Sequence, residues 1–258
     1  MTETAPVRLF QVERARVEVH QRKVEAGRAA AAQAARVLRS TLESKGSARI
    51  VVATGNSQKD LIEALRKIPG IDWGHIDVFH MDEYVGLPAN HPASFRRWVR
   101  ERLADIVHPR SIHYLNGEAS DLEKECQRYA DLLCSAPLDI CFVGFGENGH
   151  VAFNDPHVAD FNDPLMVKQV VLDDRCRMQQ VGEGHFTSLD AVPREALTLT
   201  IPALIRAKCV VSCVPEARKA EAVRNAFEGP LSPFCPASVV RTHPSAFVYL
   251  DVDSASLL

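Results

Sequence analysis

Two short segments of the chain carry residue types that suit acid–base chemistry on a small molecule. Asp82 and Glu83 follow an apolar run, and neighbouring side chains of an extended backbone point apart, so the two carboxylates should have separate roles. One could abstract a proton while the other orients it. His150 follows a second apolar run and a glycine-rich turn, and it can exchange a proton near neutral pH. Glu147 or Asp155 lies close enough in sequence to set its charge and tautomer.

Each of these residues also has a plain structural interpretation. An isolated Asp-Glu pair such as Asp82-Glu83 is commonly a solvated acidic loop, and a lone histidine is commonly a satisfied structural residue. The position of His150 favours a functional role, because open α/β sheets bind their ligands at the carboxyl ends of the strands.

A third segment and one lysine are candidates for holding an anion. The turn lies between an apolar run and a helix start, where backbone N–H groups and the helix dipole attract phosphate. Its four residues are Thr54, Gly55, Asn56 and Ser57. Lys219 begins a later helix, where a cation is disfavoured by the dipole, so a bound anion would explain it. The alternatives are an ordinary strand–helix turn capped by Ser57 and a solvent-facing lysine.

The glycine-rich segment matches the dinucleotide-binding pattern in its spacing, since Gly144, Gly146 and Gly149 form GxGxxG. That motif requires a helix to open at the third glycine. The following residues, 150–156, contain Asn, Asp and Pro, which stop a helix within about a turn. Asp173 has roughly the spacing of a ribose-binding carboxylate, so a nicotinamide oxidoreductase stays as the last alternative.

The patterns around these segments predict strands that alternate with helices. Helices are expected over residues 20–45, 57–65, 93–106, 120–133, 201–206 and 216–227. Strands are expected over residues 49–53, 76–79, 111–114, 138–143, 167–172, 209–214 and 246–251, with a loop or lid over 157–164. We therefore predict one α/β domain over residues 1–258, a Rossmann-like open sheet, mostly parallel, with helices on both faces. Residues 1–20 are expected to form an irregular N-terminal segment.

Composition sets limits on the partners of the chain. Its 258 residues are 46% hydrophobic and 24% charged, which is typical of a globular protein. A net charge of −3 offers no bulk attraction for nucleic acid or acidic membranes. No apolar stretch approaches the roughly 20 residues that a membrane span needs. The start of the chain does not have the pattern of a secretory signal. Seven cysteines without a CxxC pair favour a reducing cytoplasmic setting and give no ligand spacing for zinc.

The four segments together resemble the glucosamine-6-phosphate deaminase (isomerase) family, in order over about residues 25–250. The resemblance rests on residues 53–57, 81–88 with His91-Pro92, 144–155 and 218–220. The segments Met-Asp-Glu-Tyr-Val-Gly-Leu-Pro and Gly-His-Val-Ala-Phe-Asn are specific. The related 6-phosphogluconolactonases share the Gly-His turn and the late lysine but usually lack the Asp-Glu-Tyr segment and the Ala-Phe-Asn continuation, so the chain resembles the deaminase branch.

The resemblance implies conversion of glucosamine 6-phosphate and water to fructose 6-phosphate and ammonia, without a metal or an organic cofactor. His150 would open the pyranose ring, and Asp82 would move the C2 proton towards C1. Asn148, Asp155 and Glu147 would support the histidine. The remaining residues would bind the phosphosugar: Thr54, Gly55, Asn56, Ser57, Glu83, Tyr84, Gly144, Gly146 and Lys219. Gly144 and Gly146 would leave room for the sugar.

The chain departs from the family pattern at three places. Asn148 stands where many members have Asp, and an amide cannot stabilise an imidazolium as a carboxylate does. Asp155 stands for the family's Glu, one methylene shorter. Gln180 lies near the position of the phosphate-binding arginine, with Arg175 and Arg177 as the available substitutes. The serine and arginine residues of the allosteric effector site are missing from residues 157–168, so we expect no sugar-phosphate allostery.

Two other functions remain open on the sequence. A 6-phosphogluconolactonase-type hydrolase would use His150 to activate water, and a non-catalytic homologue would bind a sugar phosphate without turning it over. Relatives commonly form homo-oligomers, but the sequence carries no interface signature.

Overall fold

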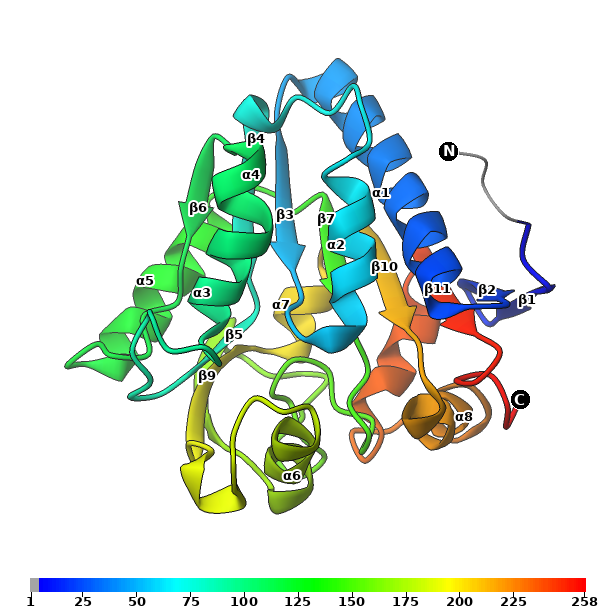
Figure 1. Ribbon diagram of the computed structural model, residues 1–258. Helices are drawn as coiled ribbons and strands as arrows, with labels where there is room; N and C mark the ends of the chain where they lie inside the picture. Colours follow the sequence, from blue (N-terminus) through cyan, green and yellow to red (C-terminus); the bar gives the residue numbers. More distant parts are fainter. Residues whose placement is uncertain (1–4) are drawn as a thin grey trace.

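The computed structural model describes residues 5–258, in which strands and helices alternate along most of the chain (Figure 1). The strands are β1 (Arg8–Val12), β2 (Ala15–His20), β3 (Ala48–Val52), β4 (Ile76–His80), β5 (Asp82–Tyr84), β6 (Ser111–His113), β7 (Ile140–Val143), β8 (Val167–Val171), β9 (Glu195–Leu199), β10 (Cys209–Val214) and β11 (Ala246–Asp251). The α-helices are α1 (Lys23–Lys45), α2 (Lys59–Leu65), α3 (Phe95–Val99), α4 (Asp105–Val107), α5 (Leu122–Cys134), α6 (Asp174–Gly182), α7 (Ile201–Ile205) and α8 (Ala220–Glu228).

The main sheet has eight strands in the order β1-β2-β11-β10-β7-β3-β4-β6, and all neighbouring pairs except β1–β2 are parallel. Successive strands β3 and β4 pair on one side, whereas β7 lies on the other side of β3. The strand order therefore reverses at β3, and such a point opens a crevice beyond the carboxyl ends of the strands. The predicted α/β fold with a mostly parallel sheet is confirmed.

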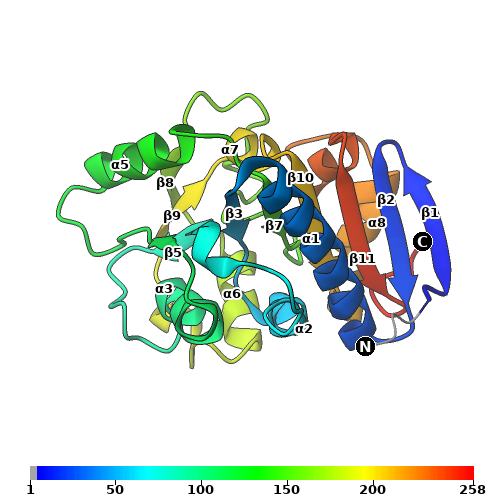
Figure 2. The same ribbon diagram turned by 90° about the horizontal axis from the view of Figure 1, so that it is seen from above.

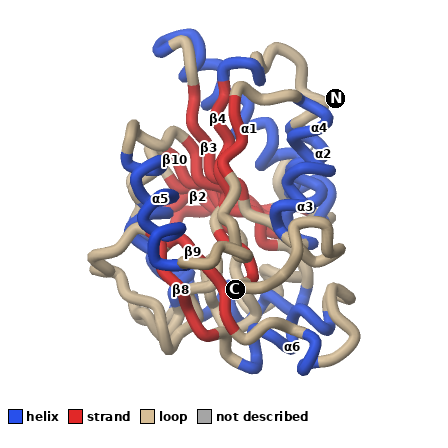
Figure 3. Tube along the Cα trace, turned by 90° about the vertical axis from the view of Figure 1, so that its left-hand side faces the viewer, coloured by secondary structure: helices blue, strands red, loops and turns tan. Residues whose placement is uncertain are grey.

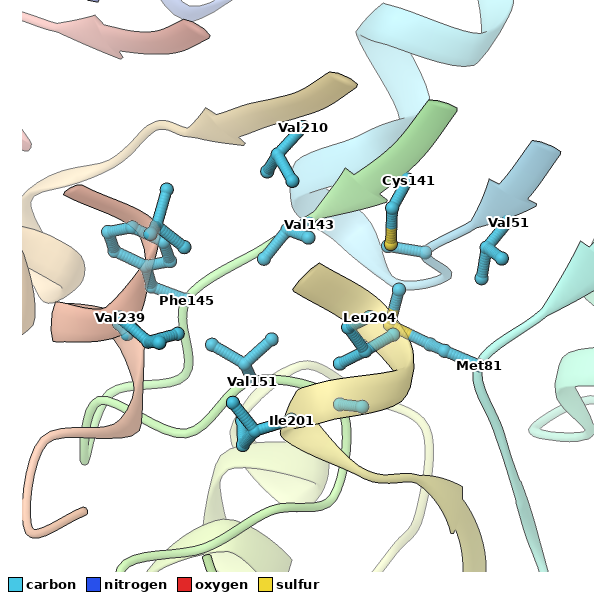
Figure 4. Packing of buried hydrophobic residues seen from close by; sticks show 14 of the residues in the cluster. Val51, Met81, Cys141, Val143, Phe145, Val151, Ile201, Leu204, Val210 and Val239 are labelled. Carbon is cyan, nitrogen blue, oxygen red and sulfur yellow. The ribbon is translucent and has the colours of Figure 1, made fainter. Parts of the chain in front are cut away.

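Both faces of the main sheet are covered, as the apolar character of its strands requires. One face packs against α1 and α2, where an alanine-rich stripe of α1 allows close approach to the sheet. The opposite face packs against α5, α7 and α8. Figure 4 shows Val51, Cys141, Val143 and Val210 on the strands, above Leu204 of α7, within the same cluster of buried residues. Figure 2 shows α1 and α2 on one side of the strands and α5 and α7 on the other.

A second sheet of three antiparallel strands, in the order β5-β9-β8, lies near the carboxyl ends of the main strands (Figure 3). The strand predicted over residues 167–172 is present as β8, and it belongs to this small sheet instead of the main sheet. Helix α6 was not predicted, because its polar Arg and Gln residues give a weak amphipathic pattern; Asp173 caps its start. The helix predicted over 93–106 begins at Phe95 and contains a π-helical turn at Arg100–Ala104.

The prediction of an irregular segment over residues 1–20 is wrong for residues 8–20, and residues 1–4 lie outside the described part. Strands β1 and β2 form an antiparallel hairpin, and β2 then pairs with β11 in parallel. Ala15, Val17 and Val19 point into the core, and the charged residues between them obscure the short alternation. Within residues 5–258, no helix has both the length and the apolar content that crossing a membrane requires.

Gly117, in the segment after β6, packs against the end of β5 at a position where a side chain does not fit. A Cβ atom there would come within 2.0 Å of the Tyr84 carbonyl oxygen. The Gly117 carbonyl also accepts a hydrogen bond of 2.7 Å from the Gly86 N–H, which closes the segment after β5.

We expect Gly117→Ala to lower the free energy of unfolding by about 2 kcal/mol or more, because backbone must shift to admit the methyl group. Gly182→Ala is the matched control, since a Cβ atom there meets nothing within 4 Å. Urea unfolding of both variants measures the difference, and equal stabilities would contradict the packing argument.

Candidate functional site

One pocket collects the polar segments that follow four parallel strands. Its walls come from the turns after β3, β4, β7 and β10, together with α6, which lies beyond the ends of the arrows of β3 and β10 in Figure 1. The lining residues are Ala53, Thr54, Gly55, Asn56, Ser57, Met81, Asp82, Phe95, Gly144, Phe145, Gly146, His150, Ala152, Phe153, Gln179, Gln180, Glu183 and Lys219. Parallel strands end at the same edge of a sheet, so distant parts of the sequence meet here.

Asp82 lies in the pocket as a buried carboxyl group. Its Oδ1 atom has no hydrogen-bond partner among the described residues, and its main chain pairs with Thr198 of β9. Burial raises the pKa of Asp82 well above its usual range, and the neighbouring Glu83 adds to this effect. A carboxyl group with a raised pKa and a free oxygen is suited to accept and return a proton.

Glu83 points away from Asp82 and is absent from the pocket lining. Its carboxylate accepts hydrogen bonds from the Ser94 hydroxyl at 2.7 Å and from the backbone N–H groups of Tyr84, Phe95 and Arg96. The Arg96 guanidinium also lies 3.1 Å from it. Tyr84 is fully buried and packs with Phe95 and Phe153. Both residues were expected to bind substrate, and the structure places them behind the pocket wall.

His150 lies in the pocket with Asp155 behind it. The distance from Nδ1 of His150 to Oδ1 of Asp155 is 3.1 Å, and the Asp155 side chain is fully buried. Burial alone would raise the pKa of Asp155, but His150, Asn148 and the Asp173 N–H lower it below its usual range. Asp155 is therefore a carboxylate that can orient the imidazole and stabilise its protonated form.

Asn148 and Glu147 do not orient the histidine ring itself. The Asn148 amide donates to Asp155 at 2.9 Å and to Asp173 at 3.0 Å, while its oxygen accepts from the backbone N–H of His150. Glu147 was expected to support the ring, but its carboxylate lies 3.2 Å from Arg218. The turn therefore fixes the backbone of His150 through Asn148, and Asp155 alone of these three residues approaches the ring.

The two strand-end glycines leave room for side chains of the protein as well as for the pocket. A Cβ atom on Gly146 would lie 2.3 Å from the His150 ring, and one on Gly144 would lie 3.0 Å from Nε2 of Gln58. The prediction that they leave room for the sugar stays a prediction, and both glycines also line the pocket. The GxGxxG pattern is followed by a bridge between Val151 and Asn154, and the chain described there opens no helix at Gly149.

The other end of the pocket holds polar groups that suit an anion. Thr54 and Ser57 supply hydroxyl groups, and Gly55 has a φ of 106°, a conformation that glycine adopts readily. Lys219 is 2% exposed, and its burial, opposed by the charge of Glu183, lowers its pKa to about 8. This end of the pocket can bind phosphate through hydroxyl groups, backbone N–H groups and one buried cation.

Helix α6 and the residues after it supply side chains that sequence reasoning missed. Glu183 and Gln179 line the pocket; Gln180 does so at the position where an arginine was sought. Burial opposes the ionisation of Glu183, but His185, Arg218 and Lys219 together lower its pKa to about 2. No local pattern marks these residues, because α6 reaches the pocket only through tertiary packing.

Neither Arg175 nor Arg177 lines the pocket. Arg175 reaches the Glu147 carbonyl and Glu221 at the surface. Arg177 is buried and donates to the carbonyl oxygens of Leu189 and Val192. Gln180 therefore lines the pocket, and neither of the two arginines does.

We expect the affinity of the pocket for sulfate to fall as the pH rises through about 8, because Lys219 then loses its proton. The limiting decline is about tenfold per pH unit. Sulfate keeps its charge over this range, so the slope reports on the protein. In Lys219→Arg the guanidinium stays protonated, and the slope should disappear. Isothermal titration calorimetry measures both proteins, and an unchanged slope in the variant would exclude this role.

The chain is similar to known proteins along most of its length. A family model described as glucosamine-6-phosphate isomerases/6-phosphogluconolactonase matches residues 21–249. The chain is 32% identical over 222 residues to glucosamine-6-phosphate deaminase of Bacillus cytotoxicus, covering 86% of this chain and 82% of the relative. It is 35% identical over 209 residues to the deaminase of Exiguobacterium sibiricum, with 81% of each covered.

The chain is also similar to solved structures. A structure described as a monomeric glucosamine-6-phosphate deaminase superposes with a TM-score of 0.85 at 31% identity, covering 94% of this chain and 99% of that one. A 6-phosphogluconolactonase of Shewanella baltica superposes with a TM-score of 0.75 at 19% identity, covering 94% and 99%. The second similarity shows a shared fold.

Proposed function

Because the chain belongs to the glucosamine-6-phosphate isomerase/6-phosphogluconolactonase family, we propose that it deaminates glucosamine 6-phosphate to fructose 6-phosphate and ammonia. The observation that carries this proposal is the arrangement of one pocket. It is lined by Asp82, a buried carboxyl group with a free oxygen, by His150, whose ring has the Asp155 carboxylate behind it, and by the cation Lys219.

In the proposed reaction each step is assigned to its own group. Lys219 and the turn from Thr54 to Ser57 hold the phosphate at one end. His150, supported by Asp155, moves a proton at the ring oxygen and opens the sugar. Asp82 takes the proton from C2 and returns it at C1. Water then attacks the resulting imine at C2, and ammonia leaves.

The high pKa of Asp82 fits its part in this sequence. A buried carboxylate is a stronger base than a solvated one, and its protonated form can hold the proton until it is returned. The pocket lining also contains Met81, Phe145 and Phe153, which limit water around the carboxyl group. Proton return to the same molecule is favoured when the solvent is excluded.

The proposal also covers the domain, the cellular compartment and the oligomeric state. The pocket takes residues from both sheets, so we propose that the chain acts as one catalytic domain with a small-molecule phosphosugar as its substrate. All seven cysteines are free, which fits a reducing compartment such as the cytoplasm. One similar structure is described as monomeric, and we propose on that similarity that the pocket functions within a single chain.

We expect Asp82→Asn to lower kcat by about 10³-fold, because an amide cannot accept the C2 proton. Asp77→Asn is the matched control: it makes the same change on the preceding strand, where Asp77 pairs with Arg110. Release of ammonia and fructose 6-phosphate from glucosamine 6-phosphate measures the activity. Absence of turnover by the folded wild-type protein would sink the proposal.

The same variant separates the proposed reaction from lactone hydrolysis. A lactonase has no proton to move at C2, so Asp82→Asn should leave hydrolysis of 6-phosphogluconolactone largely intact. Saturable binding of glucosamine 6-phosphate without turnover would identify a binding protein instead.

A further inference from the structure

Three buried side chains converge beside the catalytic pocket and offer three different ligand atoms. His150 comes from the turn after β7, Asp155 follows it, and Cys176 belongs to α6. One imidazole nitrogen, one carboxylate oxygen and the thiol sulfur all lie within 4.8 Å of one another. The three residues are 8%, 0% and 1% exposed.

The charge at this place is not balanced by lysine or arginine. Asp155 and Asp173 share one donor, the Asn148 amide, at 2.9 and 3.0 Å. Over the chain described from residue 5 onward, no ion pair of 4.0 Å or less joins either aspartate to a lysine or arginine. The Asp155 carboxylate is stabilised by His150 and by hydrogen-bond donors, and a metal cation at this place would add a full positive charge beside it.

The histidine ring presents a nitrogen atom to the same cluster. Its Nδ1 atom is buried and makes no aligned hydrogen bond, although it lies 3.1 Å from the Asp155 oxygen. An imidazole nitrogen that faces a carboxylate oxygen can hold either a proton or a metal ion towards it. Here the thiol of Cys176 completes a three-sided set around the same space.

The types of ligand atom select the ion. Nitrogen, sulfur and oxygen donors together suit Zn²⁺ and its spectroscopic substitute Co²⁺, whereas Mg²⁺ and Ca²⁺ prefer oxygen alone. With zinc–ligand distances of about 2.0–2.3 Å, tetrahedral ligands lie roughly 3.5 Å apart. The His150–Asp155 pair, at 3.1 Å, is close to this edge length, and the Cys176 sulfur lies within 4.8 Å of a ligand atom of each residue. His150 also lines the pocket, which gives an ion a route to these groups.

We propose that His150, Asp155 and Cys176 form an inhibitory site for Zn²⁺. On binding, the ion loses water molecules from its hydration shell, the thiol of Cys176 releases its proton to solvent, and the zinc–sulfur bond forms without any change of oxidation state. The histidine nitrogen and the Asp155 oxygen complete the coordination. Binding of the ion is independent of the proposed deaminase reaction. The inhibition rests on that proposed function, because the bound ion would keep His150 from transferring a proton.

Titration of the metal-free protein with Co²⁺ tests the binding without any activity measurement. We expect one equivalent per chain and the near-ultraviolet absorption of a cobalt–thiolate bond, both lost in Cys176→Ser. Cys134→Ser is the matched control, because it removes an exposed thiol and should keep the absorption. Cys176→Ala provides a second variant if the serine does not fold, as judged by circular dichroism.

Titration with Zn²⁺ then tests the inhibition in the deaminase assay. We expect the half-inhibiting concentration to rise at least about tenfold in Cys176→Ser and to stay unchanged in Cys134→Ser. Absence of the thiolate absorption in the wild-type protein, or its loss in Cys134→Ser alone, would overturn the metal site. If the protein has no deaminase activity, the Co²⁺ spectrum still decides the question of binding.

Discussion

The structure of the site depends on one buried carboxylate that takes no part in the pocket. Glu83 accepts hydrogen bonds from Ser94, from Arg96 and from three backbone N–H groups, and its side chain is fully buried. A buried charge is tolerated only when its hydrogen bonds are complete, so these partners are held in one arrangement. Because Glu83 is anchored on one side of β5, Asp82 must point to the other side, into the pocket.

Two opposite electrostatic environments lie within this small space. Asp82 has a free oxygen and a raised pKa, whereas Asp155 receives hydrogen bonds and has a lowered pKa. The same residue type can therefore serve as a proton acceptor in one position and as a permanent counter-charge in the other. The difference arises from hydrogen-bond donors around Asp155, since both groups are buried.

The anion end shows a further balance of charge. Glu183 lies among His185, Arg218 and Lys219, and Arg218 also contacts Glu147 and Glu216. These contacts connect α6 to the turn after β7 and to the segment after β10. The helix that supplies Gln179 and Gln180 is thereby fixed over the pocket by ion pairs in addition to apolar packing.

The sequence by itself determined the alternating elements, the α/β fold, the family and the segments that carry Asp82, His150 and Lys219. These follow from local periodicity and short motifs, which need no knowledge of distant contacts. It did not reveal the hairpin β1–β2, helix α6 or the small sheet, where charged residues hide short apolar patterns. Only the tertiary structure decided that Glu83 faces inward, that Glu147 pairs with Arg218, and that Gln180 and Glu183 enter the pocket. Each of these outcomes depends on contacts between segments far apart in the chain, such as β5 with β9 and α6 with the turn after β10, and no local pattern encodes them.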